Sequence, residues 1–562
     1  MILQMQHNTT SLTPAAASVS PHLPADSAAS SAARLPGAVP LSGALPLAIA
    51  GGLLLRLAFP GPSLWPLAVP GIAAILLALR GRGPWTGLLL GALAGLAFYG
   101  PLIEWATVYL GPVPWLALTG AMAVYFALMG LLIALAYRWS WQHPVAGVRH
   151  GVAPLVVAAL WTLREFVAGS WPYGGFSWGR VAQAFVDAPF ATAVAWIGTS
   201  GLSFAIVVIV AALVQVLVRW TAERDTTSVR SWGSALAGPI VAAVVLAVLP
   251  SGTVFVTSTG SLRVGAVQGN ADAALNSRNP PGTILNNHVE ASRALVGADL
   301  DVVLWPENAS DRDPLRFADA ARVLDLVSSG LDAPLVTGTI TKDGDRYFNS
   351  ALLWQAGQGA VDQYDKKHPV PFAEYVPDRW FYSLLVPDLI GLVTRDYQFG
   401  ERDALFTVPE PGNGQGAAVA GIAICFDIVD DDLMIGMVRD GATVLFAPTN
   451  NADFGRTDQH LQQFDIARMR AMETGRALVQ ASTVATSGVA LPDGTVTNRL
   501  PTFTPGAFVA DVPTYIGTTP AVALGRILEW IICLDALLAL LWLRLGMRKG
   551  RPAEAERPSS AT

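Results

Sequence analysis

Long apolar runs fill the first half of the chain and constrain its fold more than any other feature. They cover about 41–59, 65–79, 85–103, 113–137, 151–163, 189–218 and 234–256, and a last run covers about 520–543. A helix that crosses a bilayer needs about 20 apolar residues, so the second and fifth runs are expected to be tilted, kinked or re-entrant. The runs predict a polytopic α-helical membrane bundle, with about seven helices in residues 41–258 and a C-terminal transmembrane helix in residues 520–544.

The composition agrees with a membrane protein and argues against nucleic acid as a partner. Hydrophobic residues make up 52% of the 562 residues and charged residues only 14%, and the net charge is -6. Soluble proteins have about 25% charged residues. No run of Lys and Arg suggests a nucleic-acid groove. Residues 1–40 are rich in Ser, Ala, Pro and Thr and lack the pattern of a signal peptide, which predicts a disordered leader.

The basic residues of the first half indicate an orientation. Most of them fall in alternate loops, at Arg80, Arg82, Arg138, Arg149, Arg219, Arg224 and Arg230. By the positive-inside rule these loops, the N-terminus and the tail 545–562 are cytoplasmic, and the segment between the seventh and eighth runs is extracytoplasmic. Arg164 and Arg180 lie on the side that this assignment places outside, where they serve either a headgroup or a structural ion pair.

Residues 259–519 have a different pattern. Short apolar runs with β-branched residues alternate with helical patterns at 286–295, 315–327 and 461–474, and the runs cover 262–267, 302–305, 335–340, 418–425 and 443–447. Apolar strands flanked by amphipathic helices are typical of sheets covered by helices. We therefore expect an extracytoplasmic α/β domain between the membrane bundle and the last helix.

Three polar residues of this domain stand out by their position. Glu307 follows a predicted buried strand and Pro306, and Cys425 ends another apolar strand. Lys366 lies in a short loop that also holds three prolines and Glu374. Taken alone, each has an ordinary explanation: a capping acid, a solvated lysine and a small buried thiol.

Together the three residues make a nucleophilic site. A thiol attacks as its thiolate, which needs a base to take the proton and a cation to hold the charge. Glu307 can act as the base and Lys366 as the cation. Attack on a carbonyl builds an oxyanion, which Lys366 and the backbone N–H of Phe426 can stabilise.

The order Glu, Lys, Cys resembles the carbon–nitrogen hydrolase, or nitrilase, superfamily. Over residues 44–540 the chain is similar to its apolipoprotein N-acyltransferase family, with helices before and after the hydrolase domain. The motifs that carry the resemblance are Val267–Asn270, Trp305–Glu307, Lys366–Glu374, Ile424–Cys425 and Ile466–Glu473, together with the Gly175–Arg180 loop.

The resemblance implies an αββα sandwich and a role for each site residue. Glu307 is the implied general base, Lys366 the electrostatic stabiliser, Cys425 the nucleophile and Glu374 a second acid near the thiol. The sequence departs from the family where many members have Tyr-Glu after the cysteine, since Phe426 and Asp427 stand there. It departs again at Asp453, where the family often has Trp.

The resemblance also implies a reaction. Cys425 takes a fatty acyl chain from a phospholipid, and the thioester is attacked by the α-amine of the lipidated N-terminal cysteine of a diacylglyceryl apolipoprotein. We expect a monomer in the cell membrane that needs no metal and no organic cofactor.

Two alternatives stay open from the residues. One is a membrane-anchored amidase that acts on a small amide, with water as the final acceptor. The other is a transporter with an external domain, which would need ionisable residues inside its helices, and Arg56 is a rare example of one.

Overall fold

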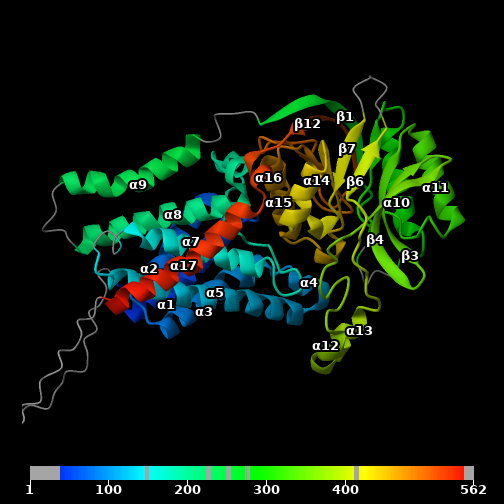
Figure 1. The fold of residues 1–562 in the computed structure, drawn as a ribbon. Helices are drawn as coiled ribbons and strands as arrows, with labels where there is room; N and C mark the ends of the chain where they lie inside the picture. Colours follow the sequence, from blue (N-terminus) through cyan, green and yellow to red (C-terminus); the bar gives the residue numbers. More distant parts are fainter. Residues whose placement is uncertain are drawn as a thin grey trace, which may run out of the picture. The chain divides into compact units, whose positions relative to one another are not determined.

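The computed structural model describes residues 38–145, 148, 151–222, 229–248, 255–271, 274, 279–409 and 417–549. Almost all of the predicted leader and most of the predicted tail 545–562 lie outside these residues. Along the described chain, a helical half comes first, an α/β half follows, and one long helix closes the sequence (Figure 1).

The helical half contains seven described helices of more than ten residues. They are α1 (Leu41–Leu57), α2 (Ala68–Leu79), α3 (Pro84–Leu102), α5 (Pro112–Trp141), α7 (Ala153–Ala168), α8 (Val194–Ala222) and α9 (Val229–Val248). A short helix, α4 (Ala106–Leu110), precedes α5. The backbones of α3 and α5 approach closely at Gly91, because glycine has no side chain. A Cβ there would overlap the backbone of Phe126. Small residues at such contacts are typical of helix packing in membranes.

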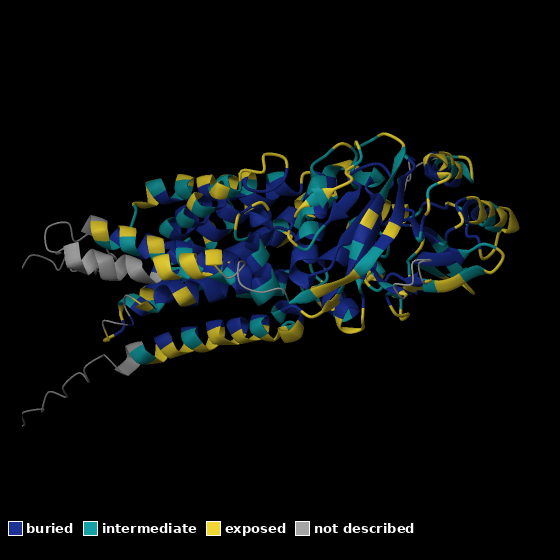
Figure 2. Cartoon of the chain, turned by 90° about the horizontal axis from the view of Figure 1, so that it is seen from above, coloured by how far each residue is buried: buried dark blue, intermediate teal, exposed yellow. Residues whose placement is uncertain are grey.

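Three stretches of helix are long and apolar enough to cross a membrane by length and composition. They are Pro84–Leu102, Pro112–Trp141 and Ala191–Trp220, and shorter apolar helices cover Leu41–Leu57, Trp65–Leu79 and Pro239–Val248. Exposed residues lie along the outer faces of the helices (Figure 2), and large apolar side chains such as Leu89, Leu116 and Val124 are among them. An apolar outer face on a buried helical core is what lipid contact requires, so the chain is a membrane protein.

The end of the chain differs from the single helix expected over 520–544. A short helix, α16 (Pro520–Leu524), comes first and α17 (Ile527–Lys549) follows. Gly525 separates them, because its φ of +56° and ψ of -139° are far from helical values and are accessible to glycine. Basic residues such as Arg544 are good helix formers, so the charges that mark the membrane boundary do not end α17 there.

The α/β half contains two six-stranded sheets. The first has the order β12-β1-β2-β3-β4-β5 and the second the order β11-β10-β9-β8-β7-β6. The first sheet consists of β1 (Val256–Gln268), β2 (Val302–Leu304), β3 (Leu335–Asp343), β4 (Arg346–Gln355), β5 (Gly359–Asp365) and β12 (Gly506–Gly517). The second consists of β6 (Leu405–Val408), β7 (Ala418–Ile422), β8 (Val444–Thr449), β9 (Leu478–Ser482), β10 (Gly488–Ala490) and β11 (Val496–Thr497). Strands β1, β2 and β3 run parallel, as do β7, β8 and β9.

Alternating side chains place the two sheets face to face. Val302 and Leu304 of β2 belong to the core that includes Phe406 and Phe446 of the second sheet. Val303, between them, packs in a separate cluster with residues of α10 (Thr283–Ser292) and α11 (Ala318–Gly330). Successive side chains of a strand point to opposite faces, so the first sheet is covered by the second sheet on one face and by helices on the other.

Two further helices, α14 (Asp431–Arg439) and α15 (Gln459–Thr474), pack against strands β7 and β9 of the second sheet. The expected αββα sandwich behind a helical membrane half is therefore confirmed.

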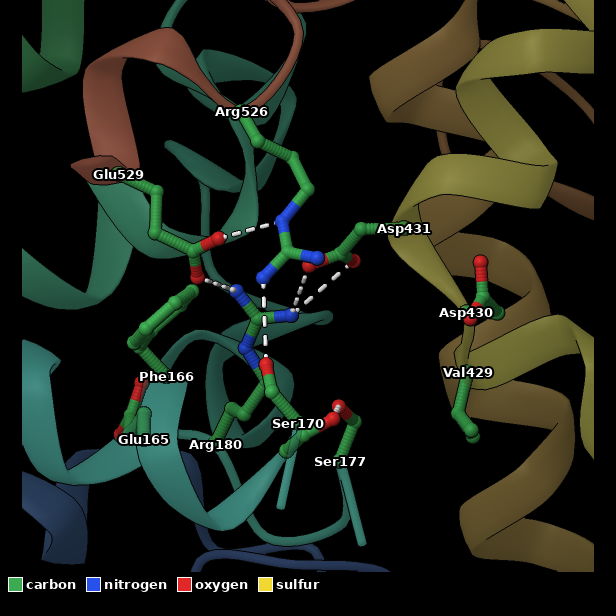
Figure 3. A pocket seen from close by; sticks show the side chains of 11 residues that line it. Glu165, Phe166, Ser170, Ser177, Arg180, Val429, Asp430, Asp431, Arg526 and Glu529 are labelled. Atoms are coloured by element: carbon green, nitrogen blue, oxygen red, sulfur yellow. Dashed lines mark hydrogen bonds and ion pairs between the residues drawn. The ribbon is translucent and has the colours of Figure 1, made fainter. Parts of the chain in front are cut away.

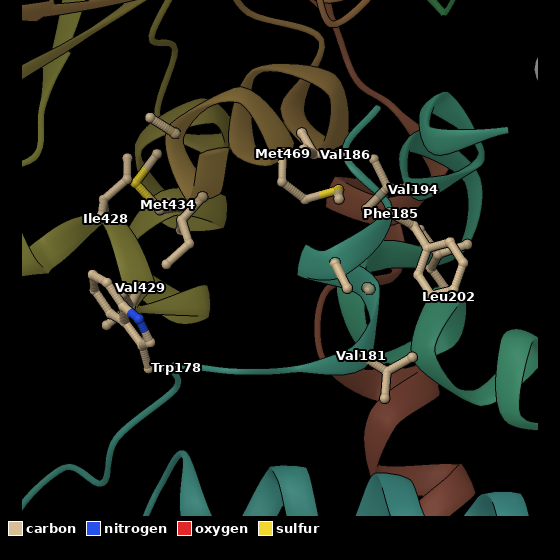
Figure 4. Close-up of a cluster of buried hydrophobic side chains, with 14 of the residues drawn as sticks. Trp178, Val181, Phe185, Val186, Val194, Leu202, Ile428, Val429, Met434 and Met469 are labelled. Atoms are coloured by element: carbon tan, nitrogen blue, oxygen red, sulfur yellow. The ribbon is translucent and has the colours of Figure 1, made fainter. Parts of the chain in front are cut away.

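The two halves share one apolar core. Figure 4 shows Trp178, Phe185 and Val194 of the helical half in one cluster with Met434 and Met469 of the α/β half. Gly198 interrupts α8 with non-helical dihedral angles. The N–H of the next residue, Thr199, donates to Glu473 Oε1 of α15 at 2.8 Å. Apolar packing and buried hydrogen bonds thus hold the α/β half against the helical half.

Candidate active site

Glu307 lies on a turn at the carboxyl end of β2, an inner strand of the first sheet. Glu307 is buried. Pro306 comes before it in the chain, and Asn308, which has a φ of +56°, comes after it. Its Oε1 accepts from Asn349 Nδ2 at 2.7 Å and its Oε2 from the backbone N–H of Asn450 at 2.8 Å. The carboxylate is therefore fixed at both oxygens and joins the two sheets.

Lys366 directly follows β5 and is fully buried, with 1% of its side chain exposed. Its Nζ lies 2.9 Å from Glu374 Oε2 and 3.6 Å from Glu307 Oε1. Glu374 also accepts from Asn349 Nδ2 at 2.6 Å and from the backbone N–H of Val370 at 2.6 Å. The loop that joins Lys366 to Glu374 thus folds back so that one cation faces two carboxylates.

Cys425 lies beyond the end of its strand. The predicted strand 418–425 was too long, because β7 ends at Ile422 and Cys425 begins a 3₁₀ turn with a φ of +52°. Such a backbone is strained for a residue other than glycine and turns the side chain out of the sheet. Its Sγ lies 4.0 Å from the Asn450 carbonyl and 3.7 Å from Gln463 Nε2. Phe426 is the next residue of the turn, and the role of its N–H stays a prediction.

Burial and charge set the protonation states of the site. Burial raises the pKa of Cys425 to about 12, Glu307 adds to the rise, and Lys366 opposes it. Burial also raises the pKa of Glu307, against the field of Lys366. Burial lowers the pKa of Lys366, but Glu374 and Glu307 raise it more, so it lies well above its usual value. The resting site therefore pairs a neutral thiol and a carboxyl group of raised pKa with a lysine that stays charged.

Asp427 supports the turn that carries Cys425. Its Oδ2 accepts from the backbone N–H of Ile424 at 3.1 Å and from the hydroxyl of Tyr364 at 2.9 Å. Burial raises its pKa to about 7, although Lys366 and both hydrogen bonds lower it. The shorter acid at this position thus ties the turn to the strand that leads into Lys366.

Sequence reasoning missed two amides of the site. Asn349 on β4 bridges Glu307 and Glu374, and Gln463 on α15 contacts the thiol. A buried Asn inside an apolar strand was a signal for the first. Gln463 belongs to a run of polar residues on a helix, and no spacing distinguishes it from its neighbours.

Aromatic rings from both halves lie beside the thiol. We call them the aromatic wall, and they are Trp105, Phe176, Trp178, Phe426 and Phe454. Phe176, Trp178 and Phe426 stack with ring centroids 5.9 to 6.3 Å apart. Trp105 contacts Phe454 edge to face at 5.0 Å. Three of these five rings come from the helical half, so the site is completed by the membrane part of the chain.

An apolar arm extends from the Lys366–Glu374 loop. It consists of α12 (Arg379–Leu385) and α13 (Pro387–Leu392), which Figure 1 shows apart from the sheets. Trp380, Leu384 and Leu385 are 73%, 76% and 61% exposed. Apolar side chains gathered on so short an arm are typical of a surface that contacts lipid or another protein.

A polar pocket lies where the two halves meet, away from the thiol. Arg180 pairs with Asp431 at 2.8 Å and with Glu529 at 3.7 Å, and Arg526 pairs with Glu529 at 2.7 Å. Figure 3 shows these side chains facing one another across the pocket. Arg164 pairs with its neighbour Glu165 at 3.4 Å. Both arginines whose role the sequence left open are therefore engaged in structural ion pairs.

Within the described residues, no group of three or more His, Cys, Asp or Glu side chains is arranged to hold a metal ion. The two cysteines, Cys425 and Cys533, are both free thiols. The site brings together a thiol, two carboxyl groups and an ammonium group.

A buried thiol, a carboxyl group and a lysine between the two sheets of an αββα sandwich are typical of the carbon–nitrogen hydrolase class. The family model for carbon–nitrogen hydrolases matches residues 263–521, and that for the N-terminal domain of apolipoprotein N-acyltransferases matches residues 51–212. The chain belongs to the apolipoprotein N-acyltransferase family.

Curated relatives agree over most of the chain. The apolipoprotein N-acyltransferase of Mycolicibacterium smegmatis is 31% identical, over 92% of this chain and 88% of its own. That of Ralstonia nicotianae is 30% identical, over 87% of this chain and 92% of its own. Among solved structures, an amidase of the nitrilase superfamily from Nesterenkonia AN1 is 16% identical with a TM-score of 0.35, over 46% of this chain and 94% of its own.

Proposed function

We propose that this protein transfers a fatty acyl chain from a phospholipid, through a thioester at Cys425, to the α-amine of the N-terminal lipidated cysteine of apolipoproteins. The observation that carries the proposal is the convergence of Glu307, Lys366 and the Cys425 thiol beside the aromatic wall, to which the helical half contributes three of the five rings. A reactive thiol next to membrane helices suits an acyl donor that resides in the bilayer.

The first half-reaction forms the thioester. Glu307 accepts the proton of the Cys425 thiol, and the thiolate attacks the ester carbonyl of the phospholipid. The oxyanion that forms lies against the Lys366 ammonium and the backbone N–H of Phe426. When it collapses, the bond from the carbonyl carbon to the glycerol oxygen breaks, Glu307 returns the proton to that oxygen, and lysophospholipid leaves.

The second half-reaction forms the amide. The neutral α-amine of the apolipoprotein attacks the thioester carbonyl, and Glu307 takes one proton from the nitrogen. The carbon–sulfur bond breaks, the proton passes to the sulfur, and the Cys425 thiol is restored. Water competes with the amine, and the aromatic wall excludes it from the acyl chain.

Lipid access and orientation complete the proposal. The apolar arm, with Trp380, Leu384 and Leu385 exposed, supports entry of the donor from a lipid surface. By the positive-inside rule, the basic loops of the first half support cytoplasmic termini and an α/β half at the outer leaflet. We propose that the protein acts there as a monomer.

Intact-mass measurement of the purified protein in phospholipid micelles tests the proposal. We expect a fatty-acyl increment that hydroxylamine removes and that Cys425→Ala abolishes. Cys533→Ala is the matched control, because Cys533 is the other thiol and lies buried on α17; it should keep the adduct. No adduct together with no lysophospholipid would contradict acyl transfer and favour an amidase acting on a small amide.

A further inference from the structure

We infer that Gln463 is a catalytic residue: its side-chain amide donates a hydrogen bond to the Cys425 sulfur and stabilises the thiolate. The inference rests on the proposed function only in taking Cys425 as the nucleophile. Gln463 lies on α15 and is buried, with 2% of its surface exposed. Its Nε2 lies 3.7 Å from Cys425 Sγ, a length that suits an N–H donor and the large sulfur atom.

The direction of the amide decides what it does to the thiol. An N–H that faces the sulfur favours the thiolate, whereas a carbonyl that faces it accepts the S–H and favours the thiol. The two ends of a glutamine amide are distinguished by their hydrogen-bond partners. A chain of buried groups around Gln463 supplies those partners.

This series of hydrogen bonds starts at a backbone N–H, which can only donate. The N–H of Ala485 donates to Ser482 Oγ at 3.1 Å, and the Ser482 hydroxyl donates its own proton to Asn451 Oδ1 at 2.7 Å. The other end of the Asn451 amide, Nδ2, therefore points away from Ser482. It donates to Gln463 Oε1 at 2.7 Å.

Gln459 reinforces the same direction, because its Nε2 also donates to Gln463 Oε1, at 3.0 Å. The carbonyl end of Gln463 is thus occupied by two donors. Its Nε2 is left to face Cys425 Sγ and Thr449 Oγ1, the latter at 2.7 Å. Since Thr449 accepts this bond, its own hydroxyl proton is available for the sulfur, and a hydrogen bond from Thr449 lowers the pKa of Cys425.

The need for such donors follows from the burial of the thiol. Burial and Glu307 both disfavour negative charge on the sulfur. Lys366, the nearby cation, is shared by two carboxylates. A hydrogen bond to an ionised acceptor is about twice as strong as one to a neutral acceptor, so the Gln463 amide acts mainly on the thiolate.

The test measures alkylation of Cys425 by iodoacetamide as a function of pH, in the full chain in detergent micelles. All variants carry Cys533→Ala, so that Cys425 is the single thiol. Gln463→Met keeps the length of the side chain and removes the donor. We expect the pH midpoint of alkylation to rise by about one pH unit or more, and the rate at neutral pH to fall about tenfold.

Gln480→Met is the matched control. Gln480 is a buried glutamine on β9, the strand against which α15 packs, and it donates to the Thr486 carbonyl at 2.9 Å. Its loss perturbs the neighbouring interior without removing a donor from the sulfur. Its pH midpoint should equal that of the parent. If Gln463→Met does not fold, Gln463→Asn keeps the amide and withdraws it from the sulfur, and the same rise is expected.

An unchanged midpoint in a folded Gln463 variant would overturn the inference, and a lowered midpoint would do so as well, because it would mean that the carbonyl faces the sulfur. The alkylation needs neither phospholipid nor apolipoprotein. A failure of acyl transfer with the expected midpoint shift would therefore count against the proposed function alone.

Discussion

At the scale of single residues, the acids near Cys425 are held in different ways. Glu307 is fixed by two donors and faces a cation, whereas Asp427 is buried against a tyrosine hydroxyl and one backbone N–H. The second oxygen of Asp427, Oδ1, has no hydrogen-bond partner among the residues that the structure describes. A buried carboxylate with an unpartnered oxygen favours its protonated form.

The raised pKa of Asp427 predicts a pH dependence of stability. The folded state binds its proton up to a pKa of about 7, while the unfolded chain releases it near the ordinary value of 3.8. The stabilisation is therefore complete below about pH 4 and is lost as the pH rises to about 7. In Asp427→Asn this loss should disappear, so the melting temperature in micelles should fall less between pH 4 and pH 7 than in the parent.

Asp325→Asn provides the control for that experiment, because Asp325 accepts from Trp354 Nε1 at 2.9 Å on the outer, helix-covered side of the first sheet. Its melting profile between pH 4 and pH 7 should follow the parent. A parallel fall in Asp427→Asn and the parent would contradict the assignment of the titration to Asp427.

Four residues that the sequence singled out lie together in the structure, whereas two amide side chains of the site were not predicted. Glu307, Lys366, Glu374 and Cys425 each lie in a local pattern of strand end, proline or loop, and the fold brings them together. Their catalytic roles stay predictions. Asn349 and Gln463 were assigned to the site only from the fold, because their partners are 25 to 42 residues away and are brought near by tertiary packing.

At the scale of elements, β3 shapes the turn that carries Glu307. The Gly338 N–H donates to the Pro306 carbonyl at 3.1 Å, and the Gly338 carbonyl accepts from Ser310 N at 3.0 Å. A Cβ on Gly338 would lie 2.6 Å from Glu307 Cα and from Asn308 N. The strand can approach the turn this closely because position 338 has no side chain.

Gly338→Ala should therefore displace Glu307, the proposed general base. We expect a loss of about 1–3 kcal/mol in the free energy of unfolding from the overlap. Because a misplacement of about 1 Å can cost about 100-fold in rate, we expect thioester formation to slow by about that factor. Single-turnover acylation by phospholipid measures the rate, and thermal unfolding measures the stability.

Gly330→Ala at the end of α11 is the matched change, since a Cβ there meets open space. It should leave both the rate and the stability close to those of the parent. An active Gly338→Ala protein would show that the turn has room to adapt.

The strands were easier to predict than their ends. Val302–Leu304, Leu335–Asp343 and Val444–Thr449 coincide closely with apolar runs of the sequence. Strand β7 ends before its run does, because the backbone turns to a positive φ at Cys425. Apolar patterning reports burial, and a buried turn next to a site has the same pattern as a buried strand.

At the scale of the whole molecule, buried ion pairs join the two halves. Arg180 of the helical half has 5% of its side chain exposed, and its partner Asp431 at the start of α14 has 13% exposed. Asp431 also pairs with Arg470 of α15 at 2.6 Å. The sequence marked Arg180 as a candidate for an ion pair but gave no signal of its partners, since Asp431 and Glu529 lie far from it in the chain.

Arg180→Met should destabilise the protein strongly. Removing one partner of a buried pair leaves an uncompensated charge and costs about 3–5 kcal/mol. Arg263→Met, which removes an exposed pair with Asp511, should cost at most about 1 kcal/mol. Chemical unfolding of both variants in micelles compares the two. Equal destabilisation would mean that the Arg180 pair is not what joins the halves.

The pairing of the first and last strands of the α/β half has a consequence for the origin of the architecture. Val256 at the start of β1 lies opposite Gly517 at the end of β12, so the chain enters and leaves this half at neighbouring points. A domain whose ends meet can be inserted into a host without separating the host's own elements. The helices before this half and α17 after it then form one bundle into which the α/β half is inserted, because α17 packs against α5, α7 and α8.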